Sequence, residues 1–338
     1  MEGAVDLCRI VRVQGLILLL LSALGCQQSP PPPTDAAAAA EPAENDPTWK
    51  WSDERVSEFW QRVNAGRSLK PASWPGGAVV AVALSFDYQM GTIYDRNPAA
   101  STNTNSIYDG RVGLPRLLEL LDKHDVPASF FTTGITAKLY PETIRQIVAN
   151  GRHEIGVHGW IHERPTDVPP EEERRLLSDA MDALQAVTGK RPVGYRSPAW
   201  EFSASSMQII REFEFLYDSG MMADDDPYEV VVDGLPTGVV EIPVEWMRDD
   251  AVYYRRQSPS SPNAVYEVWK AEFDKAYEER GLFALAMHPR ISGHRSRVVM
   301  LDQLIAYMKG HKGVWFATHE DVARYVSSEA RLAPVQAR

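Results

Sequence analysis

The residues best suited to chemistry lie in one stretch, residues 153–165, which reads HEIGVHGWIHERP. It places His158 and His162 four positions apart, with Gly159 between them. Imidazole is the commonest neutral metal ligand, and two imidazoles from one turn can converge on a single ion. Glycine allows the backbone to fold tightly enough for that convergence. Two histidines at this spacing also occur by chance on solvated surfaces, so the other reactive residues decide the interpretation.

The elements that would position this pair alternate between strands and helices from residue 79 onward. Continuous apolar, β-branched runs predict buried parallel strands at 79–86, 127–133, 153–158, 194–197, 215–217, 239–246, 282–287 and 314–317. Helical periodicity predicts helices at 111–124, 141–150, 170–187, 203–213, 264–279, 297–308 and 319–327. About seven strand–helix units favour a barrel over an open sheet. The stretch 88–110 is a long connection, and such loops in α/β folds are often functional.

Further reactive residues fall where predicted strands end. Asp87 follows the first strand, Arg196 and His288 come at the ends of later ones, and Trp246 ends the strand 239–246. The carboxyl ends of the strands in a parallel barrel share one mouth, which holds the active site. We therefore expect these side chains to meet His158 in a single site. Four other histidines are expected to be solvated in loops or at helix ends: His124, His294, His311 and His319.

Five ordered motifs carry a family resemblance. They are SFD at 85–87, the histidine stretch itself, GYRSPAWEFS at 194–203, EIPVEW at 241–246 and MHP at 287–289. On these motifs, residues 75–327 resemble the polysaccharide deacetylase (NodB-homology) family of carbohydrate esterases. The nearest branch contains peptidoglycan deacetylase-like proteins and cyclic-imide or allantoin hydrolases. The resemblance implies a distorted (β/α)7 barrel.

The same resemblance implies a role for each reactive residue. His158 and His162 match the two histidines that bind a divalent metal, with zinc the expected ion. Asp87 matches the general base, Arg196 the residue that orients it, and His288 the general acid. Such an ion polarises an amide carbonyl and acidifies water.

Substrate contacts and one departure complete the predicted site. Trp200 and Trp246 would form apolar walls suited to a sugar ring or a flat cyclic amide. Gln89 stands where this branch carries the acidic third metal ligand. Strand alternation keeps residues 87 and 89 on one face, but an amide holds Zn²⁺ less tightly than a carboxylate. Three outcomes stay open: Asp87 becomes a ligand, the metal binds weakly, or the enzyme works without metal.

The amino terminus predicts export. Residues 1–26 combine Arg9 and Arg12, an apolar run at 16–21 and Cys26 directly after Gly25, which resembles a bacterial lipoprotein signal peptide. Plain secretion is the alternative. The Pro- and Ala-rich residues 27–48 are a predicted disordered tether, followed by a catalytic domain over 49–330 and a tail over 331–338.

Composition narrows the function. The 338-residue chain carries a net charge of −11, which argues against a nucleic-acid partner. We expect a lipoprotein anchored to a membrane through lipidated Cys26 and facing the periplasm or the cell surface. Its predicted activity is hydrolysis of carbon–nitrogen bonds other than peptide bonds, through N-deacetylation of a cell-wall or other polysaccharide. The alternatives are an allantoinase-like hydrolase of small cyclic amides and imides, and an inactive glycan-binding lipoprotein.

Overall fold

The structure, a computed structural model, describes residues 47–92, 100–254 and 258–335. The chain divides into one unit that ends at Trp51 and a second, Ser52–Arg338. The described part of the first unit holds a single 3-10 turn, η1 (Thr48–Lys50). The predicted signal peptide and most of the predicted tether lie outside the described residues. Among the helices that are described, none has the length and apolar character needed to span a membrane.

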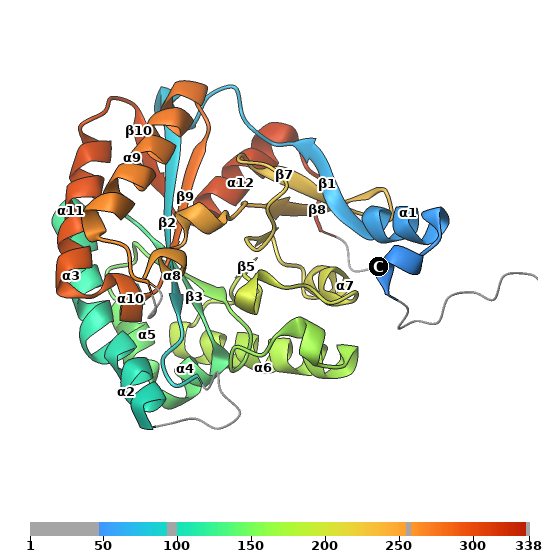
Figure 1. The fold of residues 1–338 in the computed structure, drawn as a ribbon, viewed down its shortest axis with the longest axis horizontal. Coiled ribbons are helices and arrows are strands. Elements are labelled where there is room, and N and C mark those ends of the chain that lie inside the picture. Colours follow the sequence, from blue (N-terminus) through green and yellow to red (C-terminus); the bar gives the residue numbers. More distant parts are fainter. Residues whose placement is uncertain (1–46, 93–99, 255–257, 336–338) are drawn as a thin grey trace, which may run out of the picture. The chain divides into compact units, whose positions relative to one another are not determined.

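The second unit is built on one curled sheet (Figure 1). Its strands are β1 (Val63–Ser68), β2 (Val80–Tyr88), β3 (Ser129–Thr132), β4 (Glu154–Val157), β5 (Gly194–Tyr195), β6 (Tyr217–Asp218), β7 (Tyr228–Val232), β8 (Leu235–Glu241), β9 (Leu282–Met287) and β10 (Val314–Ala317). Strand β2 pairs in parallel with β3, β9 and β10. The parallel set continues through β4, β5, β6 and β8. This arrangement confirms the predicted distorted (β/α) barrel.

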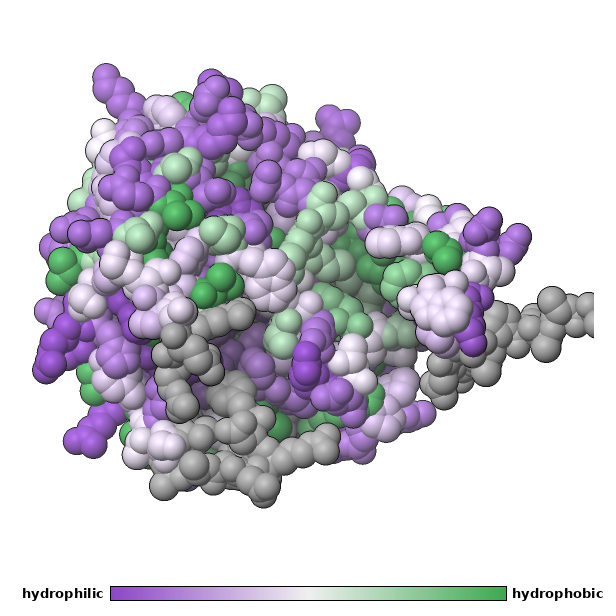
Figure 2. All heavy atoms as spheres, in the orientation of Figure 1, coloured by the Kyte–Doolittle hydropathy of each residue, from purple (hydrophilic) through white to green (hydrophobic). Residues whose placement is uncertain are grey.

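Helices cover the sheet and bury its apolar side chains. The α-helices are α1 (Asp53–Arg62), α2 (Ala100–Tyr108), α3 (Leu114–His124), α4 (Gly134–Leu139), α5 (Pro141–Val148), α6 (Pro170–Thr188), α7 (Ser206–Glu212), α8 (Asp250–Tyr253), α9 (Pro262–Glu279), α10 (Pro289–Ser292), α11 (Arg295–Lys309) and α12 (His319–Ala330). In Figure 1, α3, α9 and α11 lie together on one side of the sheet, and α4, α5 and α6 lie on another. Figure 2 shows a visible face that is largely hydrophilic, with hydrophobic residues interspersed.

The last helix, α12, contributes to the core inside the curled sheet. Helix α12 packs against β2 and β8, and its apolar residues join the core inside the curled sheet. Val322, Ala323 and Val326 share this core with Phe131 and Tyr217 of the sheet. The start of α12 therefore points into the barrel, so the expectation that His319 is solvated was wrong: this histidine is fully buried.

Two other predictions about elements need correction. The predicted strand 239–246 ends at Glu241, because Pro243 has no N–H to continue the ladder. Trp246 consequently begins a 3-10 helix, η6 (Trp246–Arg248), and does not end a strand. Strands β7 and β8 form an antiparallel hairpin across the two-residue turn Asp233–Gly234, in which both residues have positive φ. Asp-Gly is a strong hairpin signal that the strand–helix interpretation passed over.

Candidate active site

The predicted site residues come together at the carboxyl ends of the strands. A cavity of about 380 Å³ opens there, a size ordinary for a small-molecule or sugar-binding pocket. All of the predicted residues line it except Arg196, which lies buried beneath. The predicted residues that line it are Asp87, Gln89, His158, His162, Trp200, Trp246 and His288; the rest of the lining is Arg164, Ala199, Glu201, Asp249, Ala251, Val252 and Arg290. One site, and not several unrelated surfaces, therefore accounts for them.

Asp87 and Arg196 form a buried ion pair at the floor of the cavity. Arg196 Nη1 donates to Asp87 Oδ1 at 2.8 Å and to Ser85 Oγ at 2.9 Å. Ser85 and Asp87 are two apart on β2, so the pleat turns both toward the barrel interior. Arg196 Nε and Nη2 donate to the carbonyl and hydroxyl oxygens of Ser219, at 2.9 and 2.8 Å. These contacts fix the guanidinium on several sides.

The surrounding charges keep Asp87 ionised. Burial by itself would raise the pKa of Asp87, but the positive charge of Arg196, with smaller effects from His158 and His288, holds that pKa well below its ordinary value. A carboxylate in this state is a stable negative charge but a weak base.

His158 is held in the protonation state of a metal ligand. Its Nδ1–H donates to the carbonyl of Arg196 at 2.8 Å, so Nε2 is the unprotonated nitrogen and faces the cavity. Nε2 lies 3.8 Å from Asp87 Oδ2 and 2.9 Å from the amide nitrogen of Gln89. The His162 ring is 5.1 Å from the His158 ring. Burial lowers the pKa of His158 to about 4 and that of His162 to about 2, so both imidazoles are neutral at physiological pH.

The turn between the two histidines is tightly built. Gly159 has a φ of 69°, and a Cβ there would lie 2.9 Å from Pro198 and 3.0 Å from Glu163. The Glu163 carboxylate accepts hydrogen bonds from the backbone N–H groups of Trp160 and Ile161, at 2.8 and 2.7 Å. Glu163 was not predicted as a site residue, although it ends the HGWIHE motif. Its two bonds hold the turn that carries the histidines.

The side chains that face the cavity could hold a divalent ion that accepts nitrogen ligands. Two neutral imidazoles face the cavity, and the other nitrogen of His158 is bound to a carbonyl, as is usual for metal-ligating histidines. Gln89 brings no formal charge, so the set is weaker than one with a second carboxylate. A different group in the described chain also has ligand atoms close enough to hold a metal, all within 4.8 Å of one another: Asp249, Asp250 and His288.

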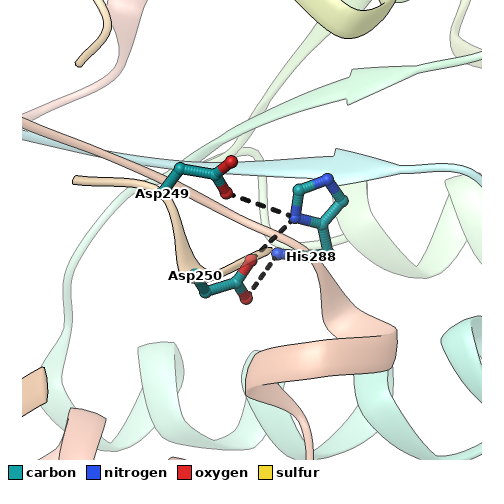
Figure 3. A group of neighbouring side chains, drawn as sticks. All are labelled: Asp249, Asp250 and His288. Carbon is teal, nitrogen blue, oxygen red and sulfur yellow. Dashed lines mark hydrogen bonds and ion pairs between the residues drawn. The ribbon is translucent and has the colours of Figure 1, made fainter. Parts of the chain in front are cut away.

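Hydrogen bonds organise this second group around His288 (Figure 3). His288 Nδ1 donates to Asp250 Oδ1 at 2.7 Å, and Asp250 Oδ2 accepts from the His288 backbone N–H and the Ser292 hydroxyl. His288 Nε2 is thereby directed toward Asp87, with Oδ2 3.9 Å away. Burial disfavours the imidazolium, but the Asp250 carboxylate outweighs it and raises the pKa of His288.

Neither aspartate was predicted as a site residue. Asp249 Oδ1 lies 3.8 Å from His288 Nδ1, and burial raises the pKa of Asp249 to about 6. The available signal was the adjacent Asp249-Asp250 pair three residues after the EIPVEW motif.

Two tryptophans stand at the rim. The rings of Trp200 and Trp246 have centroids 4.5 Å apart and are tilted by 36°. Trp246 is 47% exposed, so it presents a flat apolar surface to solvent beside the cavity. Trp200 adopts a φ of 56°, a conformation that L-residues rarely take. The rim thus offers the kind of surface on which a sugar ring packs.

The chain resembles several known proteins in sequence and in fold. A sequence family described as polysaccharide deacetylase matches residues 80–217. The peptidoglycan deacetylase of Helicobacter pylori is 29% identical over 278 residues, covering 72% of this chain and 94% of that protein. The crystal structure of a polysaccharide deacetylase homologue from Mycobacterium smegmatis superposes with a TM-score of 0.73 at 35% identity, covering 81% of this chain and 98% of that one. The PuuE allantoinase structure gives a TM-score of 0.70 at 26% identity, covering 75% and 92%.

Proposed function

The chain belongs to the polysaccharide deacetylase family, and we propose that it removes N-acetyl groups from a cell-wall polysaccharide by hydrolysis. The observation that carries the proposal is the shared carboxylate of Asp87. One of its oxygens is held by Arg196 at 2.8 Å, and the other lies 3.8 Å from His158 and 3.9 Å from His288. A negative charge, two neutral imidazoles and the imidazole of His288 thus face one space large enough for an acetamido group.

In this proposal Asp87 orients the attacking water and accepts its proton. The lowered pKa of Asp87 makes it a weak base, so the water itself has to be acidified. A divalent ion, with zinc our choice, would supply that acidity and polarise the amide carbonyl when bound. His158 and His162 are the residues that would hold it, with Gln89 as a neutral third ligand.

His288 is the proposed general acid. Its raised pKa keeps a larger share protonated at neutral pH than an ordinary histidine would have. Its Nε2 points into the cavity from the side opposite Asp250, so a proton there can pass to the departing amine. Cleavage of the C–N bond then yields acetate and a free amino sugar.

Trp200 and Trp246 are proposed to bind the sugar rings that flank the acetamido group. Stacking on an exposed indole suits a polysaccharide, because the apolar face of a pyranose can pack on a flat aromatic surface. A small cyclic amide would leave much of this rim unused.

The predicted export signal is consistent with a cell-wall substrate. We propose that the signal peptide is cleaved between Gly25 and Cys26, so that Cys26 becomes the first residue of the mature protein and carries the lipid. The predicted tether over 27–48 would then keep the catalytic domain close to the membrane and within reach of the wall. Peptidoglycan is an acetylated polysaccharide of that location.

A substrate comparison tests the proposal. The purified protein is incubated with Zn²⁺ and either acetylated chitooligosaccharide, peptidoglycan or allantoin, and acetate and allantoate are measured. We expect acetate from a polysaccharide and no allantoate. Formation of allantoate without acetate would identify the protein as a cyclic-amide hydrolase. Tight glycan binding without any product would favour an inactive binding protein.

A further inference from the structure

Arg196 has five N–H donors, and the contacts described so far satisfy four of them. Nε and one Nη2–H are bound by Ser219, and the two Nη1–H groups by Ser85 and Asp87. The fifth donor, on Nη2, faces His319 Nε2 at 3.4 Å. His319 comes from the first turn of α12, far along the chain from the other site residues, and is fully buried.

The surroundings of His319 fix which nitrogen carries its proton. Its backbone N–H and its Nδ1 both face Ser129 Oγ, at 2.8 and 3.2 Å. Ser129 in turn donates to the Glu154 carboxylate at 2.7 Å, so its oxygen is left to accept from His319. The imidazole proton is therefore on Nδ1, and the Nε2 lone pair points at the guanidinium. Burial, and then the positive charge of Arg196, lower the pKa of His319 far below its ordinary value, so the ring stays neutral.

An aromatic ring completes the enclosure. The guanidinium carbon of Arg196 lies 4.0 Å from the centroid of Phe131, over the ring face. Phe131 also meets the His319 ring edge-on, with centroids 5.3 Å apart. Phe131 restrains the guanidinium from one face and leaves rotation in its own plane to be restrained by hydrogen bonds. His319 is the acceptor that faces the remaining Nη2–H.

We propose that His319 is a positioning residue for the deacetylation reaction, whose Nε2 lone pair holds Arg196 in the orientation that presents Nη1–H to Asp87. The inference rests on the proposed function for its kinetic readout. His319 does not touch the cavity, so it acts through Arg196 alone.

Two substitutions separate the acceptor from the ring. His319→Phe keeps a planar ring and removes both nitrogens, whereas His319→Gln offers an amide oxygen near the place of Nε2. Thr237→Val is the control, because Thr237 is buried outside the cavity and its hydroxyl donates to the Val230 carbonyl at 2.7 Å and accepts from the Val239 N–H at 3.1 Å. For each variant, kcat and KM for acetate release and the unfolding temperature are measured.

We expect His319→Phe to lower kcat about tenfold with KM unchanged, the usual effect of losing one hydrogen bond to a charged group. His319→Gln should recover most of that loss, and Thr237→Val should keep the wild-type kcat. A wild-type kcat in His319→Phe, or a glutamine variant as slow as the phenylalanine one, would overturn the proposal. In an Arg196→Lys background, His319→Phe should cost nothing further, and an additive loss would contradict action through Arg196.

A measurement on the wild-type protein does not depend on activity or on a variant that folds. Nitrogen-15 NMR of the His319 ring should show Nδ1 protonated and Nε2 unprotonated from pH 5 to pH 8. An Nε2–H tautomer or a doubly protonated ring would overturn the inference. Absence of acetate release by the wild type, with the expected ring spectrum, would reject the proposed function and leave the placement of His319 intact.

Discussion

Replacing Asp250 with asparagine removes one charge from beside the proposed general acid and changes little else in size. In the wild type, the Asp250 carboxylate is 2.7 Å from His288 Nδ1 and raises the pKa of that histidine. A hydrogen bond to a charged group contributes about 1.5–3 kcal/mol, and each 1.4 kcal/mol is about a factor of ten in rate. We therefore expect kcat/KM at neutral pH to fall about 10- to 100-fold in Asp250→Asn.

The pH dependence of kcat/KM tests the direction in which Asp250 shifts the pKa of His288. The protonated form of His288 is the acid, so activity is present below its pKa and is lost as pH rises through that value. Without the Asp250 charge the pKa falls, and the alkaline limb of kcat/KM should move to lower pH. The assay is acetate release measured across pH 5 to 10.

Asp249→Asn is the matched control for this experiment. Asp249 is adjacent in sequence, but its oxygen lies 3.8 Å from His288 Nδ1, beyond hydrogen-bond distance. Its variant should move the alkaline limb less than Asp250→Asn does. An unmoved limb in Asp250→Asn, or equal movement in the two variants, would refute the assignment of His288 as an acid tuned by Asp250.

Four further substitutions probe the rest of the account. His158→Ala should abolish bound metal and lower acetate release at least 100-fold, checked by elemental analysis and by the same assay. Gln89→Glu adds a carboxylate beside His158 and should tighten Zn²⁺ binding about 10- to 100-fold in a chelator competition; unchanged affinity would show that residue 89 is no ligand. Trp246→Ala should raise KM for chitooligosaccharide about tenfold with kcat retained, as loss of a stacking surface predicts. Cys26→Ser should release the protein from the membrane fraction of expressing cells, and a variant still sedimenting with membranes would contradict lipid anchoring.

The buried parallel strands were the part of the fold that the sequence predicted best, because each is a short apolar run. The apolar runs 79–86 and 282–287 form β2 and β9 with nearly the predicted bounds. Strands that form only by pairing with a segment far away in the sequence were harder to predict. Strand β1 (Val63–Ser68) is mostly exposed and polar, and only its antiparallel pairing with β7 makes it a strand.

The site residues also divide into those that the sequence predicted and those that it missed. Asp87, Arg196 and His288 were found because motif and strand end coincide. Asp250 and Glu163 were missed because their roles depend on hydrogen bonds to other residues, Asp250 to His288 and Glu163 to the backbone of Trp160. From the sequence alone, neither can be told from an acidic residue exposed to solvent. His319 was missed for a different reason. It was expected to be solvated at a helix end, and only tertiary packing places the first turn of α12 against Arg196.

The central claim is that Asp87 acts within one deacetylase site at the mouth of this barrel. The most direct test is acetate release from peptidoglycan by the wild type and by Asp87→Asn, which keeps the shape and removes the charge, with Thr237→Val as the control for folding. The account predicts release by the wild type and the control and a loss of about 100- to 10,000-fold in Asp87→Asn, the range for a general base. Equal release by all three proteins would contradict it.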